Sequence, residues 1–353
     1  MKKLNKLFEK KKSVPLDKFL NFALYDKEFG YYTRNHIFGK KGDFITAPLI
    51  SNLFGEMISI WCISFWEHLK KPKKILITEL GPGDGSLCET LLKTFKNFSE
   101  FYNAVEFNLI EVSKNLKLKQ MKRIRNNKVK WINNIKDIKT GPIIFLCNEF
   151  FDALPIKQIH VKKKRFYEKF VSFSKKKKLN FVLKNANNKL VNKVINLKLH
   201  SSQGVIEYPL NSIKYIKDIS KKINKYNGGL LIIDYGNKES NNQNTLQSVR
   251  KHNFSNILSN VGKNDITSLV DFKLLSFILK KENLKVNKLV NQNEFLQKLG
   301  IKERANIIAN KITFKSKAKL FFDLKRLLDN RYMGSLFKVL FAQKRNKKFL
   351  LGF

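Results

Sequence analysis

The sequence predicts an α/β protein with a mostly parallel β-sheet. From about residue 75 onward, short apolar runs of strand length alternate with longer runs of helical periodicity, which is the pattern of parallel sheets. The apolar run 75–79 ends in an acid, and the chain then turns through Gly81, Gly83 and Gly85 into a helix. Ligands of such sheets bind at the carboxyl ends of the strands, so this loop is the expected ligand site.

Length and composition fit one large domain with insertions or two modest domains. The chain has 353 residues, of which 43% are hydrophobic, and this is enough to bury a sizeable core. We expect residues 1–72 to form a helical N-terminal extension. Residues 73–353 form the expected core, with a β-hairpin insertion at about 161–200 and a helical insertion at about 237–330.

The N-terminal extension is expected to contain two main helices. Ser13 and Pro15 precede apolar residues at helical spacing from Leu16 to Leu24, which predicts a capped amphipathic helix. Residues 53–69 are also apolar at helical intervals. This second helix is expected to pack on the core.

The elements of the core alternate between strand and helix. The first are a strand at 75–79, a helix at 86–98, a strand at 104–111, a helix at 113–125, a short strand at 129–131 and a strand at 143–147. Next come a β-hairpin at 161–185 with a lysine-rich turn at 174–178, a helix at 215–225, a strand at 228–234 and a polar loop at 237–244. The last are helices at 265–281 and 292–310 and a strand at 337–343.

The glycine loop suits a ligand that lies against the backbone. Glycine allows close approaches that a Cβ atom would block, and the start of the next helix offers unpaired N–H groups. The spacing is Gly-x-Gly-x-Gly followed by Ser86, whereas a dinucleotide fold has Gly-x-Gly-x-x-Gly and an acid about 20 residues further on. For the loop alone, another nucleotide or a purely structural turn are alternatives.

Together with a second acid, the loop resembles the S-adenosylmethionine (SAM) loop of class I methyltransferases. Glu79 ends the first strand, and Glu111 ends the next strand, where it would accept hydrogen bonds from the two ribose hydroxyls. Both acids suit a cationic sulfonium ligand, because SAM has no phosphate to neutralise. The expected cofactor is therefore SAM, and the expected cofactor-binding residues are Glu79, Gly81, Gly83, Gly85, Glu111 and Asn148.

Further segments resemble the MidA-type family of SAM-dependent methyltransferases. They are 30–32, 39–48, 54–56 with Trp61, 148–155, 233–236, 245–247 with His252, 265–267 with 270–272, and 333–334 with 337–339. This family is related to the mitochondrial complex I assembly factor that methylates an arginine of a partner protein. The resemblance runs from about Pro15 to about Ala342 and implies a Rossmann-like class I fold. One departure is Ser268-Leu269, where relatives commonly have a histidine.

An arginine acceptor requires carboxylates near the methyl donor. The protonated guanidinium has no available electron pair, so carboxylates must orient it and take up the proton and charge. Glu149 and Asp152 follow the strand 143–147, and Asp234 ends the strand 228–234. These three are the expected catalytic residues. The alternatives are that Asp152 caps a turn, that Glu149 pairs with a lysine and that Asp234 belongs to a structural turn.

The resemblance also implies an acceptor site. Its expected residues are Asp43, Phe44, Thr46, Phe151, Tyr235, His252 and Asp271. The loop that contains Asp43, Phe44 and Thr46 resembles the family's flap over the cofactor and acceptor; the alternative is a loop that packs the extension on the sheet. His252 is either an acid–base group or a polar packing residue. Asp271 either faces the cleft or pairs with a lysine.

The formal net charge of +42 invites a nucleic-acid partner, but the composition argues against one. Lysine far outnumbers arginine and is dispersed along the chain, whereas arginine is preferred for bidentate phosphate and base contacts. We interpret the charge as a solvated background, with docking of an acidic partner and RNA binding as alternatives. The expected partner is a protein substrate, such as a respiratory complex I subunit, and the oligomer considered is a homodimer.

Nothing in the sequence predicts a membrane span, a disulfide or a metal site. No window approaches 18 consecutive apolar residues. Cys62, Cys88 and Cys147 lie in separate segments without metal-ligand or redox spacing. The charged start of the chain does not resemble a signal peptide. These observations predict a soluble cytoplasmic protein.

The leading prediction is a SAM-dependent methyltransferase that acts on an arginine side chain of a partner protein, of the complex I assembly type. One alternative is an RNA or small-molecule methyltransferase, although the acidic cleft argues against RNA. The other is a SAM-binding assembly chaperone with little turnover, which the departure at Ser268-Leu269 keeps open.

Overall fold

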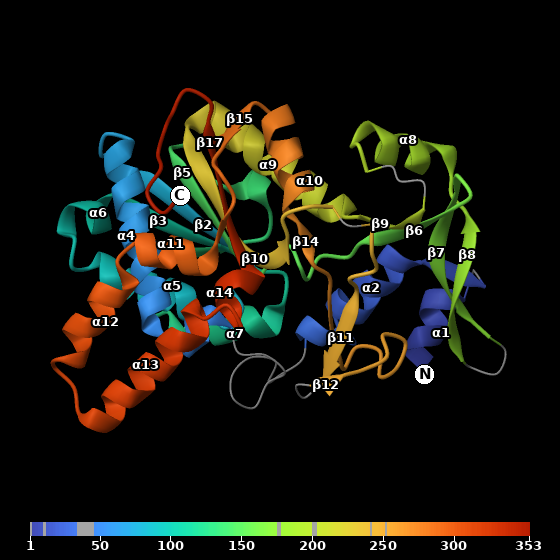
Figure 1. The fold of residues 1–353 in the computed structure, drawn as a ribbon, viewed down its shortest axis with the longest axis horizontal. Coiled ribbons are helices and arrows are strands. Elements are labelled where there is room, and N and C mark those ends of the chain that lie inside the picture. Colours follow the sequence, from blue (N-terminus) through green and yellow to red (C-terminus); the bar gives the residue numbers. More distant parts are fainter. Residues whose placement is uncertain are drawn as a thin grey trace.

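The computed structural model describes residues 2–9, 12–33, 46–174, 178–199, 203–240, 242–250 and 253–353. At the centre of this described part is a nine-stranded sheet (Figure 1). In order across the sheet, the main strands are β15 (Leu284–Val286), β17 (Phe337–Lys344), β10 (Gly228–Asn237), β5 (Ile143–Asn148), β2 (Ile75–Leu80), β3 (Val105–Ile110) and β4 (Val129–Ile132). Two short strands complete it, since β14 (Val270–Asp271) pairs with β10 and β16 (Val290–Asn291) pairs with β17.

The middle of this sheet is parallel and one edge is antiparallel. Parallel pairing joins β10, β5, β2, β3 and β4. In contrast, β17 pairs antiparallel with β10, β15 and β16. The prediction of a mostly parallel α/β sheet of the Rossmann-like class I type is confirmed. All five parallel strands therefore present their carboxyl ends at one edge, where ligands bind in such folds.

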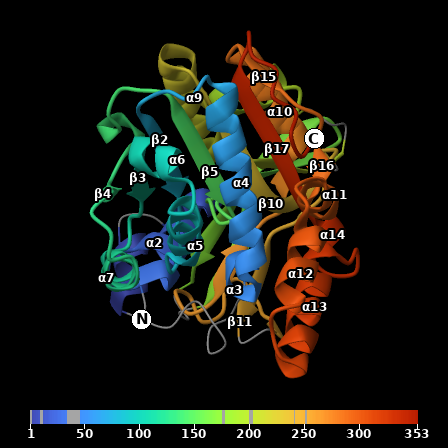
Figure 2. The ribbon, with the colours of Figure 1, turned by 90° about the vertical axis from the view of Figure 1, so that its left-hand side faces the viewer.

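Helices cover both faces of the sheet because alternate residues of each strand point to opposite sides. In β2, Ile75 and Ile77 belong to one hydrophobic cluster, and Leu76 and Leu80 belong to the other. The first cluster includes α4 (Asn52–His68), α5 (Ser86–Phe95), α11 (Gln292–Lys298), α12 (Ile301–Ala309) and α13 (Phe314–Leu328). The second includes α9 (Leu210–Tyr226) and α10 (Phe272–Lys281). Figure 2 shows α4 lying along the sheet.

A second, antiparallel sheet is built from the insertion and the N-terminal segment. Its strands are β1 (Ser13–Pro15), β7 (Arg165–Phe173), β6 (Lys157–Lys162), β9 (Gly204–Tyr208) and β8 (Leu179–Asn185). The predicted hairpin corresponds to β7 and β8, and β1 pairs with β7 from the far end of the sequence. Helix α2 (Leu16–Tyr25) packs here, because Phe19 and Leu20 share a cluster with Val171.

The remaining elements are short. A third sheet contains β11 (Gln247–Arg250), β12 (Asn253–Phe254) and β13 (Asp265–Thr267). The other helices are α1 (Lys2–Phe8), α3 (Ala47–Ile50), α6 (Ser99–Ala104), α7 (Lys114–Arg123), α8 (Asn188–Asn196) and α14 (Met333–Leu336), with 3-10 turns at Tyr31–Thr33 and Ile135–Asp137. Among the described residues, no helix is both long enough and apolar enough to span a bilayer.

Three predicted elements differ from the structure. Ser13 lies in β1, so α2 begins after Pro15 and has no side-chain cap. Residues 265–271 form β13 and β14 instead of the start of a helix, because they pair with β11 and β10. The helix predicted at 292–310 is two helices, α11 and α12, separated at Gly300, whose φ of +84° is left-handed.

Candidate active site

A deep cleft opens at the carboxyl edge of the parallel strands. Its volume is about 800 Å³, which is in the range of small-molecule and cofactor sites. Its lining includes Glu79, Gly81, Gly83, Glu111, Asn148, Glu149, Phe150, Asp152, Tyr235, Asp265 and Thr267, together with Tyr25, Tyr32, Thr46 and Pro48 from the N-terminal segment. Residues from the ends of β2, β3, β5 and β10 thus meet residues of the N-terminal segment and of β13 in one site.

The glycine loop has the backbone conformation that its sequence predicts. Gly81, Gly83 and Gly85 have φ values of +66°, +54° and +85°, a region that residues with a Cβ atom rarely adopt. A Cβ atom on Gly81 would lie 2.8 Å from the ring of Phe150. The loop can therefore lie close to a ligand and to the next strand end only because it lacks side chains.

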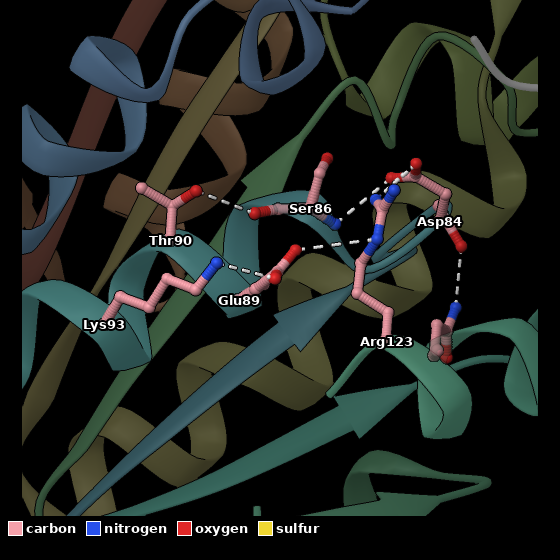
Figure 3. A network of polar contacts seen from close by, with 8 residues as sticks. Asp84, Ser86, Glu89, Thr90, Lys93 and Arg123 are labelled. Atoms are coloured by element: carbon pink, nitrogen blue, oxygen red, sulfur yellow. Dashed lines mark hydrogen bonds and ion pairs between the residues drawn. The ribbon is translucent and has the colours of Figure 1, made fainter. Parts of the chain in front are cut away.

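Polar contacts hold this loop against the helices that follow it (Figure 3). The Asp84 carboxylate accepts a hydrogen bond from the backbone N–H of Ser86 at 3.1 Å and pairs with Arg123 of α7. Arg123 also pairs with Glu89 at 3.6 Å. These contacts fix the loop between α5 and α7 before any ligand binds.

The two strand-end acids occupy the same end of the cleft. Burial, and then the charge of Asp84, raises the pKa of Glu79 to about 8, and Glu79 Oε2 has no hydrogen-bond partner among the described residues. Burial also raises the pKa of Glu111. Glu111 accepts hydrogen bonds from the backbone N–H of Ser113 at 2.8 Å and from Gln120 at 3.2 Å.

Gln120 is a residue of this site that the sequence did not single out. It is fully buried in α7 and donates to the carbonyl of Gly83 at 2.8 Å as well as to Glu111. Its own oxygen accepts from Trp131 at 2.9 Å. This one side chain therefore links the glycine loop to Glu111. The sequence around Gln120 does not indicate this role, because the residue lies within a lysine-rich helix.

This end of the cleft fits SAM. A buried carboxylate oxygen without a partner, on Glu79, suits a ligand that carries a positive charge. The glycine loop and the start of α5 provide a surface of backbone for close approach. Glu111 is held in place at the end of the neighbouring strand. A carboxylate at this position could accept hydrogen bonds from the ribose hydroxyls.

Glu149 and Asp152 lie at the other end of the cleft. Glu149 has a left-handed backbone with φ of +51°, a sparsely populated conformation that is common at functional sites. Its Oε1 accepts from the backbone N–H of Ala47 at 3.4 Å and from Asn148 at 3.2 Å. Burial raises the pKa of Glu149 to about 7.

Asp152 is a buried acid of the cleft with an unpartnered oxygen. Its side chain is 6% exposed, and Oδ1 has no hydrogen-bond partner among the described residues. Burial raises its pKa well above the usual range, and the charges of Asp234, Glu149 and Asp265 add to this shift. A cation placed between Glu149 and Asp152 would relieve the cost of their burial.

Asp234 acts on the backbone and does not line the cleft. It is fully buried, and its Oδ2 accepts from the N–H groups of Phe150, Phe151 and Asp152 at 3.2, 2.9 and 3.4 Å. Its other oxygen accepts from the N–H of Tyr235 at 2.9 Å. Asp234 therefore holds the backbone of the turn that carries Asp152, and its catalytic role stays a prediction.

A group of tyrosines that sequence reasoning did not assign closes this end. Tyr25 donates to the carbonyl of Ala153 at 2.9 Å, and Tyr32 donates to Asp265 Oδ1 at 2.9 Å. The two rings stack with centroids 5.3 Å apart. Tyr32 lies in a segment that resembles the family, but no role was predicted for it. The resemblance could have identified this residue, whereas residue spacing could not.

The other predicted residues divide between two cavities. Thr46, Asn148 and Tyr235 line the cleft. Phe151 is buried and lines a separate cavity of about 50 Å³, so of the two phenylalanines Phe150 is the one that lines the cleft. Asp271 lines the same small cavity, accepts from the N–H of Leu274 at the start of α10 and from Ser240, and is a helix cap.

Three predicted residues fall outside the described part of the chain, and a fourth position departs from the resemblance. Asp43, Phe44 and His252 lie outside the residues that the structure describes. Ser268, which stands where relatives commonly have a histidine, donates its backbone N–H to the carbonyl of Asp152 at 3.0 Å. This position thus touches the backbone of the acidic end, while its side chain lines the small cavity.

Comparisons with known proteins agree with this geometry. A model of a family described as S-adenosyl-L-methionine-dependent methyltransferases, Methyltransf_28, matches residues 57–290. Similar sequences include the protein arginine methyltransferase NDUFAF7, mitochondrial, of Xenopus tropicalis, 30% identical over 95% of this chain and 84% of that protein. The protein of the same name in Homo sapiens is 27% identical over 92% of this chain and 78% of that protein.

A solved structure has the same fold. It is a protein of Burkholderia thailandensis bound to S-adenosyl-homocysteine, with a TM-score of 0.81, 19% identity, and coverage of 97% of this chain and 90% of that chain. At this identity the likeness concerns the fold alone. This likeness supports the class I fold, and the family match supports SAM as the cofactor.

Proposed function

The chain belongs to the Methyltransf_28 family of S-adenosyl-L-methionine-dependent methyltransferases, and we propose that it methylates the guanidinium group of an arginine in a partner protein. The observation that carries this proposal is the pair Glu149 and Asp152, two buried carboxyl groups in the same cleft as the SAM loop. The name of the Xenopus tropicalis relative, protein arginine methyltransferase, supports the same acceptor.

The acidic end of the cleft suits a cation of fixed, planar shape. Neither the Glu149 nor the Asp152 carboxylate forms an ion pair among the described residues, in a chain with a net charge of +42. A guanidinium offers five N–H donors in one plane and is the side chain best suited to bridge two carboxylates. Charge-assisted hydrogen bonds of this kind are about twice as strong as neutral ones.

The residues of the chain bind, orient and deprotonate the acceptor. SAM, when bound, supplies an electrophilic methyl group, and the protein supplies position and electrostatics. Glu149 Oε1 and Asp152 Oδ1 would hold two edges of the guanidinium so that one nitrogen faces the SAM loop. Asp152 Oδ1, which has no hydrogen-bond partner among the described residues, is placed to accept the proton that this nitrogen loses.

The aromatic residues around the acids exclude water from this transfer. Tyr25, Tyr32 and Phe150 line the cleft, and Phe150 packs against Tyr215 with ring centroids 5.1 Å apart. A dry site strengthens the interaction between the carboxylates and a bound guanidinium. It also protects the transferred methyl group from side reactions with water.

We further propose that the partner is a respiratory complex I subunit, as the resemblance to the MidA-type family implies, and that transfer takes place in the cytoplasm. The described cysteines Cys62, Cys88 and Cys147 are buried free thiols, which supports a reducing compartment. Relatives are named mitochondrial, so fractionation of source cells with an antibody against the protein is the test of location. Recovery in a membrane-bounded organelle would contradict the cytoplasmic proposal.

Transfer of a labelled methyl group tests the acceptor class. The purified protein is incubated with methyl-tritiated SAM and an extract of cells that lack it, and the product is divided between protease and ribonuclease digestion. We expect label that survives ribonuclease, is lost with protease and is absent when Glu149→Gln replaces the wild type. Label sensitive to ribonuclease would overturn the protein acceptor in favour of RNA, and SAM binding without any label would favour an assembly role.

A further inference from the structure

The helical hairpin formed by α12 and α13 exposes apolar side chains to solvent. Phe314 is 87% exposed and Phe322 is 61% exposed. The exposed apolar residues, which we name the hairpin surface, are Ile307, Ile312, Phe314, Phe321 and Phe322. Figure 1 shows both helices at the edge of the molecule, reaching beyond the central sheet.

Packing of the fold does not account for this surface. Helix α13 already buries one apolar face, since Leu324 and Leu327 belong to the hydrophobic cluster on the central sheet. Phe322 precedes Leu324 by two residues and so lies on about the opposite side of the helix, and Phe314 and Phe321 lie between the two sides. A helix that needs one apolar face to fold therefore carries a second one.

The hairpin surface is surrounded by cations. Among the described residues, the exposed lysines of this hairpin that form no salt bridge are Lys302, Lys311, Lys315, Lys317 and Lys325. The acids between residues 301 and 328 are Glu303, which is exposed, and Asp323, which is buried and pairs with Lys319. The hairpin thus combines apolar side chains with a strong local excess of positive charge.

We propose that the hairpin surface docks on a bilayer that contains anionic phospholipid. Phenylalanine and isoleucine side chains can enter the boundary between head groups and acyl chains, as they do in amphipathic helices that lie on membranes. The neighbouring lysines can extend their charged ends to the lipid phosphates while their stems remain in apolar surroundings. Apolar residues and cations therefore act on the same partner.

The same features argue against other partners. A second copy of the chain would bring the lysines of one hairpin against those of the other, and like charges at an interface oppose association. Nucleic acid would satisfy the lysines but would leave the phenylalanines against phosphate and water. A planar lipid surface also fits a hairpin that projects from the body, because it requires no complementary pocket.

Docking through this hairpin would hold the rim of the cleft near the lipid. Helix α13 contacts α3, and Pro48 of α3 lines the cleft together with Thr46. The inference does not depend on the identity of the methyl acceptor. If the acceptor protein is itself bound to a membrane, docking would raise its effective concentration at the cleft.

A tryptophan placed in the hairpin tests insertion directly. We compare Phe314→Trp with Phe254→Trp, because Phe254 is 81% exposed on β12, outside the hairpin. Vesicles contain phosphatidylcholine alone or with phosphatidylglycerol, and part of the lipid carries brominated acyl chains that quench tryptophan. We expect a blue shift and quenching for Phe314→Trp with the anionic vesicles, beyond the background of the native tryptophans, and no such change for Phe254→Trp.

Neutralising charges separates local docking from the overall field of the protein. One double variant replaces Lys315 and Lys317 of α13 by Gln. The control double variant replaces Lys189 and Lys193 of α8 by Gln, so that both variants have the same net charge. In sedimentation with anionic vesicles we expect the hairpin variant to bind about 25-fold more weakly, at roughly five-fold per lysine. The α8 variant should bind within about two-fold of the wild type.

Three outcomes would overturn the proposal. Equal quenching at positions 314 and 254, or equal weakening by both lysine pairs, would mean that only the general charge attracts lipid. A blue shift of Phe314→Trp that grows with protein concentration in the absence of vesicles would assign the hairpin surface to a second copy of the chain. Absence of quenching at position 314, with the variant folded and active, would leave an acidic protein as the partner.

Discussion

The two ends of the cleft are built in different ways. The cofactor end uses the backbone of one contiguous loop, 81–85, and an acid from the next strand, Glu111. The acceptor end uses side chains from segments far apart in the sequence, among them Tyr32, Glu149 and Asp265. The first end thus offers backbone N–H groups beside the acids Glu79 and Glu111, and the second offers the carboxyl groups of separate segments.

This difference has an energetic side. Glu149 and Asp152 are buried without a cation among the described residues, and burial raises the pKa of each. Their ionised forms therefore reduce the stability of the free protein. An arginine acceptor would neutralise this pair, as a cationic cofactor would neutralise Glu79, whose pKa burial also raises, to about 8.

Substitution of Glu149 by Gln should have the largest effect and should separate the two ends. Gln keeps the size of the side chain but cannot stabilise a guanidinium or its proton, so we expect turnover to fall by about 10²- to 10⁴-fold. SAM affinity, measured by calorimetry, should change by less than about three-fold. Glu106→Gln, at an acid of β3 that pairs with Lys74 outside the cleft, is the matched control. Unchanged turnover would remove Glu149 from the mechanism.

Substitution of Glu111 by Ala should show the reverse pattern. Loss of charged hydrogen bonds to the ribose would weaken SAM binding by about 10- to 100-fold. Calorimetry measures the affinity, and circular dichroism checks that the loss of the contacts with Ser113 and Gln120 has not unfolded the protein. Glu100→Ala on α6 serves as the exposed control. If the variant binds SAM as the wild type does, the ribose assignment is wrong.

Substitution of Asp234 by Asn should reveal a positioning role. The N–H groups of residues 150–152 would lose the charge on their shared acceptor, so we expect the free energy of unfolding to drop by about 1–3 kcal/mol. Chemical denaturation measures this change. The pH at which kcat/KM reaches half its plateau should stay where it is in the wild type. A shift of this pH with full stability would show that Asp234 itself titrates in the reaction.

The stability of the ligand-free protein should fall as the pH rises from about 5 to about 8.5. The pKa values of Glu79 and Glu149 are about 8 and about 7 in the folded protein, above the value of about 4.3 in an unfolded chain. The folded state binds more protons between these values, so raising the pH favours unfolding. We expect the Tm to fall by a few degrees, and Glu79→Gln to flatten the curve. A Tm that rises over this range would contradict the burial of these acids as the cause.

Prediction from sequence worked best where the signal was contiguous. The core strands β2, β3, β5 and β10 coincide with apolar runs, which can be recognised without knowing the partner strands. The left-handed conformation of the loop 81–85 could be predicted from its glycines. The short strands β13 and β14 have no such signal, because their pairing with β11 and β10 comes from distant residues. Local helical periodicity therefore led to a wrong prediction at 265–271.

The acceptor end was only partly predictable for the same reason. Glu149 and Asp152 were expected at the end of a strand, but the left-handed backbone of Glu149 ends the alternation of the strand and turns Phe150, not Phe151, into the cleft. Asp234 is turned away from the cleft because it accepts hydrogen bonds from backbone N–H groups after β5, such as that of Phe151. Tyr25 and Tyr32 reach the site through the packing of α2, which sequence spacing does not reveal.

The identity of the methylated product tests the account most directly. After transfer from methyl-tritiated SAM to protein of an extract that lacks this enzyme, the labelled protein is hydrolysed and its amino acids are separated beside methylated standards. The account predicts label in methylarginine with the wild type and none with Glu149→Gln. Label in methyllysine, or in another residue that carries no guanidinium, would contradict the assignment of Glu149 and Asp152 as the guanidinium site.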